Sequence, residues 1–104
     1  MHIQVKAGSG AHLSDGEIDQ ISTVVEDRLA RYRERLTSVE VFISDENSRE
    51  KHGKNDKRCL IEARPAGLQP VAVEVHTDNY LEAVDACAEK VLHALEHRFG
   101  RLES

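Results

Sequence analysis

The hydrophobic period of this 104-residue chain changes twice along its length, and no other feature constrains the fold as strongly. Apolar residues recur every three or four positions between 18 and 36 and again between 81 and 99, whereas they alternate with other residues in 39–44 and 71–76. A period near 3.6 indicates an amphipathic helix, and a period of two indicates a strand with one buried face. Each helical stripe therefore needs a sheet to cover.

The first half of the chain is predicted to form a strand, a helix and a second strand. Residues 2–6 alternate as a short strand, and the turn at 8–10 ends it. Ser14 precedes Glu17 by three residues, the spacing of a capping box at a helix start. The apolar stripe of the helix then continues as far as Leu36, and a strand follows at 39–44.

The second half is predicted to form two more strands and a second helix. A polar loop from 45 to 56 leads to strands at 57–64 and 71–76, which a turn at 65–67 separates. Thr77 or Asp78 is expected to cap the last helix, and Gly100 is expected to end it. The apolar stripe of that helix contains Leu81, Val84, Ala88, Val91, Leu92, Leu95 and Phe99.

This β-α-β-β-β-α order predicts one α+β domain over residues 1–104 with two layers. A right-handed crossover makes the first two strands parallel, short connections make the other pairs antiparallel, and both helices cover one face of a four-stranded mixed sheet. The other face is mostly polar apart from Phe42 and Leu60. Because isolated apolar residues are common on protein surfaces, the favoured interpretation is that these two residues have no binding role. The alternative is a small patch that faces a partner.

The composition excludes several classes of protein. Lys and Arg number 14 against 19 Asp and Glu, so the formal charge of −5 is not the strongly basic balance that announces nucleic-acid binding. No apolar run approaches the roughly 20 residues of a membrane span, and no signal peptide is recognisable, so a cytoplasmic protein is expected. Cys59 and Cys87 lie far apart, and two small half-buried thiols are favoured over a zinc or redox site.

No enzymatic motif is present, so we expect neither an enzyme nor a cofactor nor a small-molecule substrate. The phosphate loop G-x-x-x-x-G-K-S/T and the G-x-S-x-G nucleophile elbow are both missing, and no catalytic residues are assigned. His93 and His97 have the four-residue spacing of helical metal ligands, yet they lie outside the apolar stripe and lack the adjoining glutamate of the zincin motif. Surface histidines are favoured, and no metal site is predicted.

The charges are segregated along both predicted helices. Acidic residues precede basic ones in each helix, and the segregation extends beyond the end turns where the helix macrodipole acts. A second explanation for this pattern is a basic patch across the two helices, on which Arg and Lys side chains would contact phosphates. Structured RNA is a suitable target because A-form helices are recognised largely by shape and phosphate.

With this element order, the chain resembles the ribosome hibernation-promoting factor and ribosome-associated inhibitor family. The resemblance covers nearly the whole chain and includes residues 25–31 of the first helix, Val-Glu-Asp-Arg-Leu-Ala-Arg, and residues 83–85 and 89–91 of the last, Ala-Val-Asp and Glu-Lys-Val. Residues 44–48 and 56–64 resemble a compact, divergent branch of the family. Because the chain ends soon after the last helix, it resembles the short form, without the C-terminal domain by which long members pair ribosomes.

The resemblance implies a cytoplasmic bacterial protein that binds the small ribosomal subunit near the decoding channel and down-regulates translation in stress or resting phase. In that family, basic side chains on the two helices contact rRNA. Arg28, Arg31 and Lys90 match basic positions of the family, and His93 and His97 stand where basic residues are common. The argument from the patch adds four weaker candidates, namely Arg33, Arg35, Arg98 and Arg101.

Two other functions stay open. One is a protein-interaction or self-association module, including a weak homodimer, which kept the fold without ribosome binding; the acidic total charge and the Phe42 and Leu60 pair motivate it. The other is a metal-dependent activity that uses His93 and His97, and it is the least favoured.

Overall fold

The computed structural model describes residues 1–46 and 56–103 and confirms the predicted element order. The elements are β1 (His2–Ala7), α1 (Asp15–Leu29), the 3-10 helix η1 (Ala30–Arg35), β2 (Leu36–Asp45), β3 (Lys57–Pro65), β4 (Val71–Thr77) and α2 (Tyr80–Glu103). Most of the predicted loop at 45–56 lies outside the described residues. No helix in the described part of the chain has the length and apolar content needed to cross a membrane.

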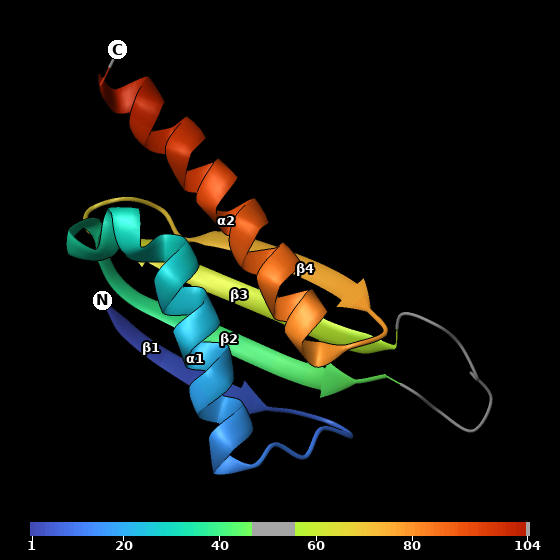
Figure 1. Cartoon of the computed structure of the whole chain (residues 1–104). Helices are drawn as coiled ribbons and strands as arrows, with labels where there is room; N and C mark the ends of the chain where they lie inside the picture. The colour runs from blue at the N-terminus through green and yellow to red at the C-terminus, as the bar shows by residue number, and fades with distance from the viewer. Residues whose placement is uncertain (47–55, 104) are drawn as a thin grey trace.

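The four strands form one mixed sheet in the order β1-β2-β3-β4. β1 pairs with β2 in parallel, and the other two pairs are antiparallel. Figure 1 shows α1 and α2 on the same face of this sheet, running in the same general direction, so that their C-terminal ends lie toward one end of the molecule. The predicted fold class, an α+β structure with both helices on one face, is confirmed.

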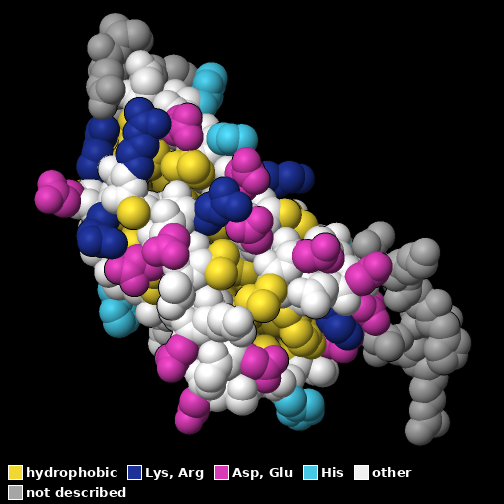
Figure 2. Space-filling view, viewed as in Figure 1, with side chains coloured by type: hydrophobic (Ala, Val, Ile, Leu, Met, Phe, Trp, Pro, Cys, Tyr) yellow, Lys and Arg dark blue, Asp and Glu magenta, His cyan; other side chains and the backbone are white. Residues whose placement is uncertain are grey.

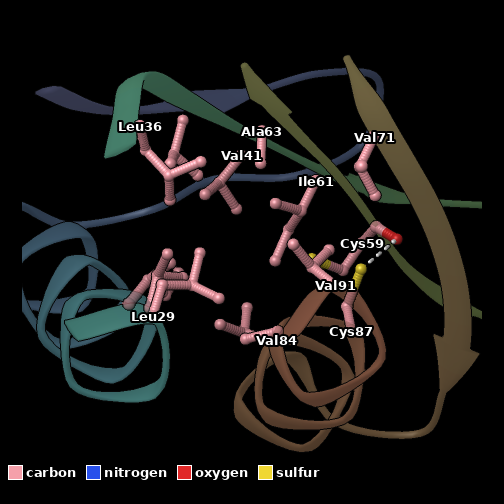
Figure 3. Packing of buried hydrophobic residues seen from close by; sticks show 14 of the residues in the cluster. Leu29, Leu36, Val41, Cys59, Ile61, Ala63, Val71, Val84, Cys87 and Val91 are labelled. Atoms are coloured by element: carbon pink, nitrogen blue, oxygen red, sulfur yellow. Dashed lines mark hydrogen bonds between the residues drawn. The ribbon is translucent and has the colours of Figure 1, made fainter. Parts of the chain in front are cut away.

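The core lies between the helices and the sheet, where both hydrophobic periods meet. Val39, Val41 and Ile43 of β2 alternate toward the helices and are fully buried, as are Cys59 and Ile61 of β3. The helices contribute a further fully or almost fully buried set, which comprises Ile21, Val25, Leu29, Val84, Val91, Leu95 and Phe99. Figure 3 shows side chains from the sheet and both helices meeting in this layer.

The start of α1 has the predicted capping box. The Ser14 Oγ accepts a hydrogen bond from the Glu17 backbone N–H at 3.1 Å, and the Ser14 N–H donates to the Glu17 carboxylate at 3.0 Å. Hydrogen bonds from the backbone and the side chain of Ser14 hold the pKa of Glu17 below its usual 4.5. The two residues thus satisfy amide donors that the first helical turn leaves unpaired.

The first helix ends earlier than the apolar period predicts, and that prediction is wrong. The α-helix stops at Leu29, six residues of 3-10 helix follow, and Tyr32 has non-helical angles of φ −109° and ψ 17°. Leu36 opens β2 opposite Pro65, with a register shift before Ser38. Leu36 is nevertheless buried because the 3-10 segment delivers it to the same core, so its spacing alone does not distinguish helix from strand.

Both predicted ends of the last helix are also wrong. Asn79 caps α2, because its Oδ1 accepts hydrogen bonds from the N–H groups of Leu81 and Glu82 at 2.9 and 3.2 Å. Thr77 instead closes a tight turn, with its Oγ1 contacting the backbone of Asn79. Gly100 lies within α2, which continues to Glu103.

The two cysteines are free thiols, and both are fully buried in the core rather than half-buried as predicted. The Cys87 Sγ approaches the carbonyl oxygens of Val73 at 3.1 Å and Cys59 at 3.6 Å (Figure 3). A hydrogen bond with Cys87 and burial both raise the pKa of the Cys59 thiol. The raised pKa keeps Cys59 a neutral thiol, and both cysteine side chains fill the core as small apolar residues.

Candidate nucleic-acid interface

The helix-covered face is the surface on which the candidate basic residues lie. In Figure 2, the Lys and Arg side chains gather most densely at the upper left, over η1 and the adjoining part of α2, and acidic side chains lie beside this group and over the rest of the face. The arginines of η1 and the basic residues in the C-terminal half of α2 come to the same end because the two helices run in the same direction, whereas acidic residues outnumber basic ones in both N-terminal halves. The positive charge of this face is therefore concentrated at one end.

Arg28 lies at the seam between the two helices and is engaged in an ion pair. Its Nε donates to the Asp85 Oδ1 at 2.8 Å, and its Nη2 lies 2.7 Å from the same oxygen. Both side chains are partly exposed, at 41% for Arg28 and 46% for Asp85. A phosphate that binds Arg28 must therefore compete with the Asp85 carboxylate, a contact that the basic sequence pattern does not reveal.

Arg31 and Arg35 come together where η1 meets the end of α2. The Arg35 guanidinium carbon lies 3.7 Å from the centre of the Phe99 ring, and the Arg31 guanidinium carbon lies 5.5 Å from the Tyr32 ring centre. With Glu96, these four residues line a hollow of about 360 Å³. Both guanidinium groups are exposed and supported by aromatic rings, an arrangement that favours contact with RNA.

Arg33 does not line that hollow, but it borders a neighbouring hollow of about 390 Å³ together with Arg31 and Arg35. Its Nη2 donates to the Glu26 carboxylate at 3.2 Å, and both side chains are about half exposed. An exposed ion pair of this kind contributes roughly 0–1 kcal/mol to stability, so the guanidinium can exchange partners.

The candidates on α2 are divided between two surroundings. Lys90, His93 and His97 are exposed, and within the described residues Lys90 has no hydrogen-bond or ion-pair partner. Arg98 is half-buried and donates to the carbonyl oxygen of Gln69, between β3 and β4. Arg101 lies in the last turn of α2. A phosphate could therefore bind Lys90 without displacing a carboxylate, whereas it would have to displace the carbonyl oxygen of Gln69 to bind Arg98.

The opposite face of the sheet brings the two predicted outer apolar residues together. Phe42 and Leu60 are directly opposed across β2 and β3, and both are half-buried. They line a hollow of about 520 Å³ that Lys6 and Arg58 border on its two sides. The pair is thus a contiguous small patch rather than two isolated residues.

Side chains with metal-ligating atoms meet at the edge of the sheet rather than on the helices. Glu46, Glu74 and His76 place candidate ligand atoms within 4.8 Å of one another, and all three residues are exposed. Arg58 donates to the Glu74 carboxylate at 2.8 Å, which lowers the pKa of Glu74 and occupies this cluster with a cation. His93 and His97 are not part of it.

The comparisons with known proteins show one family through a family model and one fold through solved structures. The model of the family described as Sigma 54 modulation protein / S30EA ribosomal protein matches residues 9–103. A ribosomal subunit interface protein from Coxiella burnetii has a similar fold, with a TM-score of 0.70 and 17% identity over 96% of this chain and 99% of that chain. The N-terminal domain of Thermus thermophilus Protein Y superposes with a TM-score of 0.65 and 23% identity over 93% of this chain and 98% of that chain. No curated protein matches.

Proposed function

The chain belongs to the Sigma 54 modulation protein / S30EA ribosomal protein family, and on that premise we propose that it binds rRNA of the small ribosomal subunit near the decoding channel. Binding there lowers translation in stressed or resting cells. The observation that carries this proposal is the family match over residues 9–103, which includes every helix and strand except β1. The protein acts by occupying a site on the ribosome and performs no chemical step.

The helix-covered face is the surface that contacts the rRNA. Lys90 and Arg31 are exposed and have no carboxylate partner among the described residues, so each can bind a phosphate without breaking an ion pair. Arg28 contributes less, because it must leave Asp85 first. His93 and His97 lie on the same exposed side of α2 and add positive charge only when protonated.

Sedimentation with purified 30S subunits across a salt series tests the proposal. Phosphate contacts release counterions, so binding should weaken steeply with salt, and each lost contact should reduce the slope of log affinity against log salt by about one. Lys90→Gln and Arg31→Gln are expected to flatten the slope. Lys6→Gln and Arg64→Gln make the same charge change on β1 and β3, and should leave it unaltered because they lie on the outer face of the sheet.

Failure to co-sediment at low salt would overturn the proposal, and equal effects of all four variants would overturn the assigned face. The hollow over Phe42 and Leu60 favours a second candidate function in that case, a protein-interaction or self-association module. Analytical ultracentrifugation and affinity capture test it. A concentration-independent monomer mass with no captured partner would count against this second function.

A further inference from the structure

Two aromatic rings and a guanidinium group pack together where η1 meets the end of α2. The Tyr32 and Phe99 rings have centroids 4.8 Å apart with 43° between their planes, and they are only 8% and 2% exposed. The Arg35 guanidinium carbon lies 3.7 Å from the Phe99 centroid, and Arg35 itself is exposed. Two buried rings thus support a guanidinium group at the surface.

The Phe99 ring restricts where this guanidinium group can lie. A distance of 3.7 Å to the ring centre is a close cation–π contact. Lys also makes cation–π contacts, but only the planar guanidinium of Arg can stack face to face on another planar group. Unpaired RNA bases stack on guanidinium planes as they do on aromatic rings. Because Phe99 already holds the group in place, a base that stacks on Arg35 costs less side-chain entropy than one that orders a mobile arginine.

The hollow beside Arg35 adds a second kind of recognition. It is open to solvent, has a volume of about 360 Å³, and is lined by Arg31, Tyr32, Arg35, Glu96, Phe99 and Gly100. Glu96 has no hydrogen-bond or ion-pair partner among the described residues. An ionised carboxylate only accepts hydrogen bonds, so it repels a phosphate but accepts from the amino group of a base. The lining therefore suits a nucleoside, with a base near Glu96 and a phosphate near Arg31.

We propose that this hollow binds one unpaired RNA base, which stacks on the guanidinium plane of Arg35 and donates an amino hydrogen to Glu96. Guanine, adenine and cytosine carry such an amino group, whereas uracil does not. The inference rests on the proposed function, for which it names the type of nucleotide that the end of the helix layer binds. Arg35 acts here as a planar platform rather than as one more positive charge.

Short single-stranded RNAs of equal charge test this proposal. We would compare the dissociation constants of a fluorescein-labelled oligouridine with one central guanine, the same RNA with an abasic site at that position, and an all-uridine RNA. Stacking on a side chain is worth about 1–3 kcal/mol per base, so the abasic RNA should bind at least about fivefold more weakly. The all-uridine RNA should bind with intermediate affinity.

Two substitutions assign the effect to its residues, and one serves as a control. Arg35→Lys keeps the charge but removes the plane, so it should abolish the preference for guanine over the abasic site. Arg33→Lys makes the same change in the same segment at a residue that pairs with Glu26 and does not line this hollow, so it should preserve that preference. Glu96→Ala should remove the preference for guanine over uracil, whatever it does to overall affinity.

Equal binding of the guanine and abasic RNAs to the unmodified protein would overturn the inference, and this comparison needs no variant to fold. Loss of the preference in Arg33→Lys as strongly as in Arg35→Lys would also overturn it. If either result is obtained while the protein still co-sediments with 30S subunits, the base-binding proposal has failed and the proposed ribosome binding stands. Absent co-sedimentation at low salt would instead refute the proposed function.

Discussion

Asp85 restrains Arg28 at the seam between the helices, so its neutralisation should strengthen binding to the small subunit. Asp85→Asn removes a negative charge from the helix-covered face and releases a guanidinium that two contacts of 2.8 and 2.7 Å now hold. Glu40→Gln is the matched control: it makes the same charge change on the outer face of the sheet, where Glu40 pairs with Lys6 at 3.7 Å.

The magnitude follows from the exposure of the pair and from counterion release. Because both side chains are more than 40% exposed, the ion pair stabilises the fold by only about 0.2–1 kcal/mol. The variant should therefore unfold no more than about 4–8 °C below the unmodified protein. One additional phosphate contact adds about 0.9 to the slope of log affinity against log salt concentration. Its contribution to the affinity is therefore roughly eightfold larger at 0.1 M salt than at 1 M salt.

Co-sedimentation or fluorescence anisotropy with 30S subunits at several salt concentrations measures this effect. Asp85→Asn should bind several-fold more tightly near 0.1 M salt and show a steeper salt dependence, whereas Glu40→Gln should match the unmodified protein. Weaker binding by a correctly folded Asp85→Asn would refute the reasoning, since it would mean that the carboxylate orients Arg28 for rRNA rather than competing for it.

Three further changes test the account of the fold. Leu29→Ala empties a site that is 0% exposed and should cost about 2–5 kcal/mol in urea unfolding; a loss below about 1 kcal/mol would contradict the packing described. Gly10→Ala should destabilise by about 1–3 kcal/mol and more than Gly67→Ala, because both glycines have φ 74° but only the Gly10 Cβ would meet a backbone oxygen, that of Asp45, at 2.7 Å. Glu17→Gln should reduce the thermal stability above pH 4.5, the usual pKa of this carboxyl group, and the difference from the unmodified protein should fade as the pH falls through the lowered pKa of the folded state. A difference that does not depend on pH would count against the capping contact.

The sequence predicted the element order and the core well because both depend on periodicity, but it did not predict the helix ends. Leu36 follows Tyr32 by four residues, so a helical stripe and a strand start are equally compatible with its burial. Thr77, Asp78 and Asn79 are all good capping residues, and only the backbone path selects Asn79. The local sequence therefore identified the region in which each helix begins or ends, whereas tertiary packing determines the exact residue.

The candidate site was predicted as a set of positions but not as a set of contacts. The basic run at 28–35 is visible in the sequence, yet the pairing of Arg28 with Asp85 joins residues 57 positions apart. The stacking of Arg35 on Phe99 is equally long-range. The segregated charges did indicate the basic end of the helix-covered face, because the parallel helices place their C-terminal halves at the same end. The assignment of these residues to rRNA binding stays a prediction.

Site-specific cross-linking tests most directly whether the helix-covered face contacts small-subunit rRNA. A photoreactive residue replaces either Glu89, exposed on α2 beside Lys90, or Gln4, exposed on the outer face of the sheet. After irradiation of the complex with 30S subunits, the account predicts cross-links from position 89 to 16S rRNA near the decoding channel and none to rRNA from position 4. Cross-links to rRNA from position 4 alone, or from position 89 to a distant region of the subunit, would contradict it.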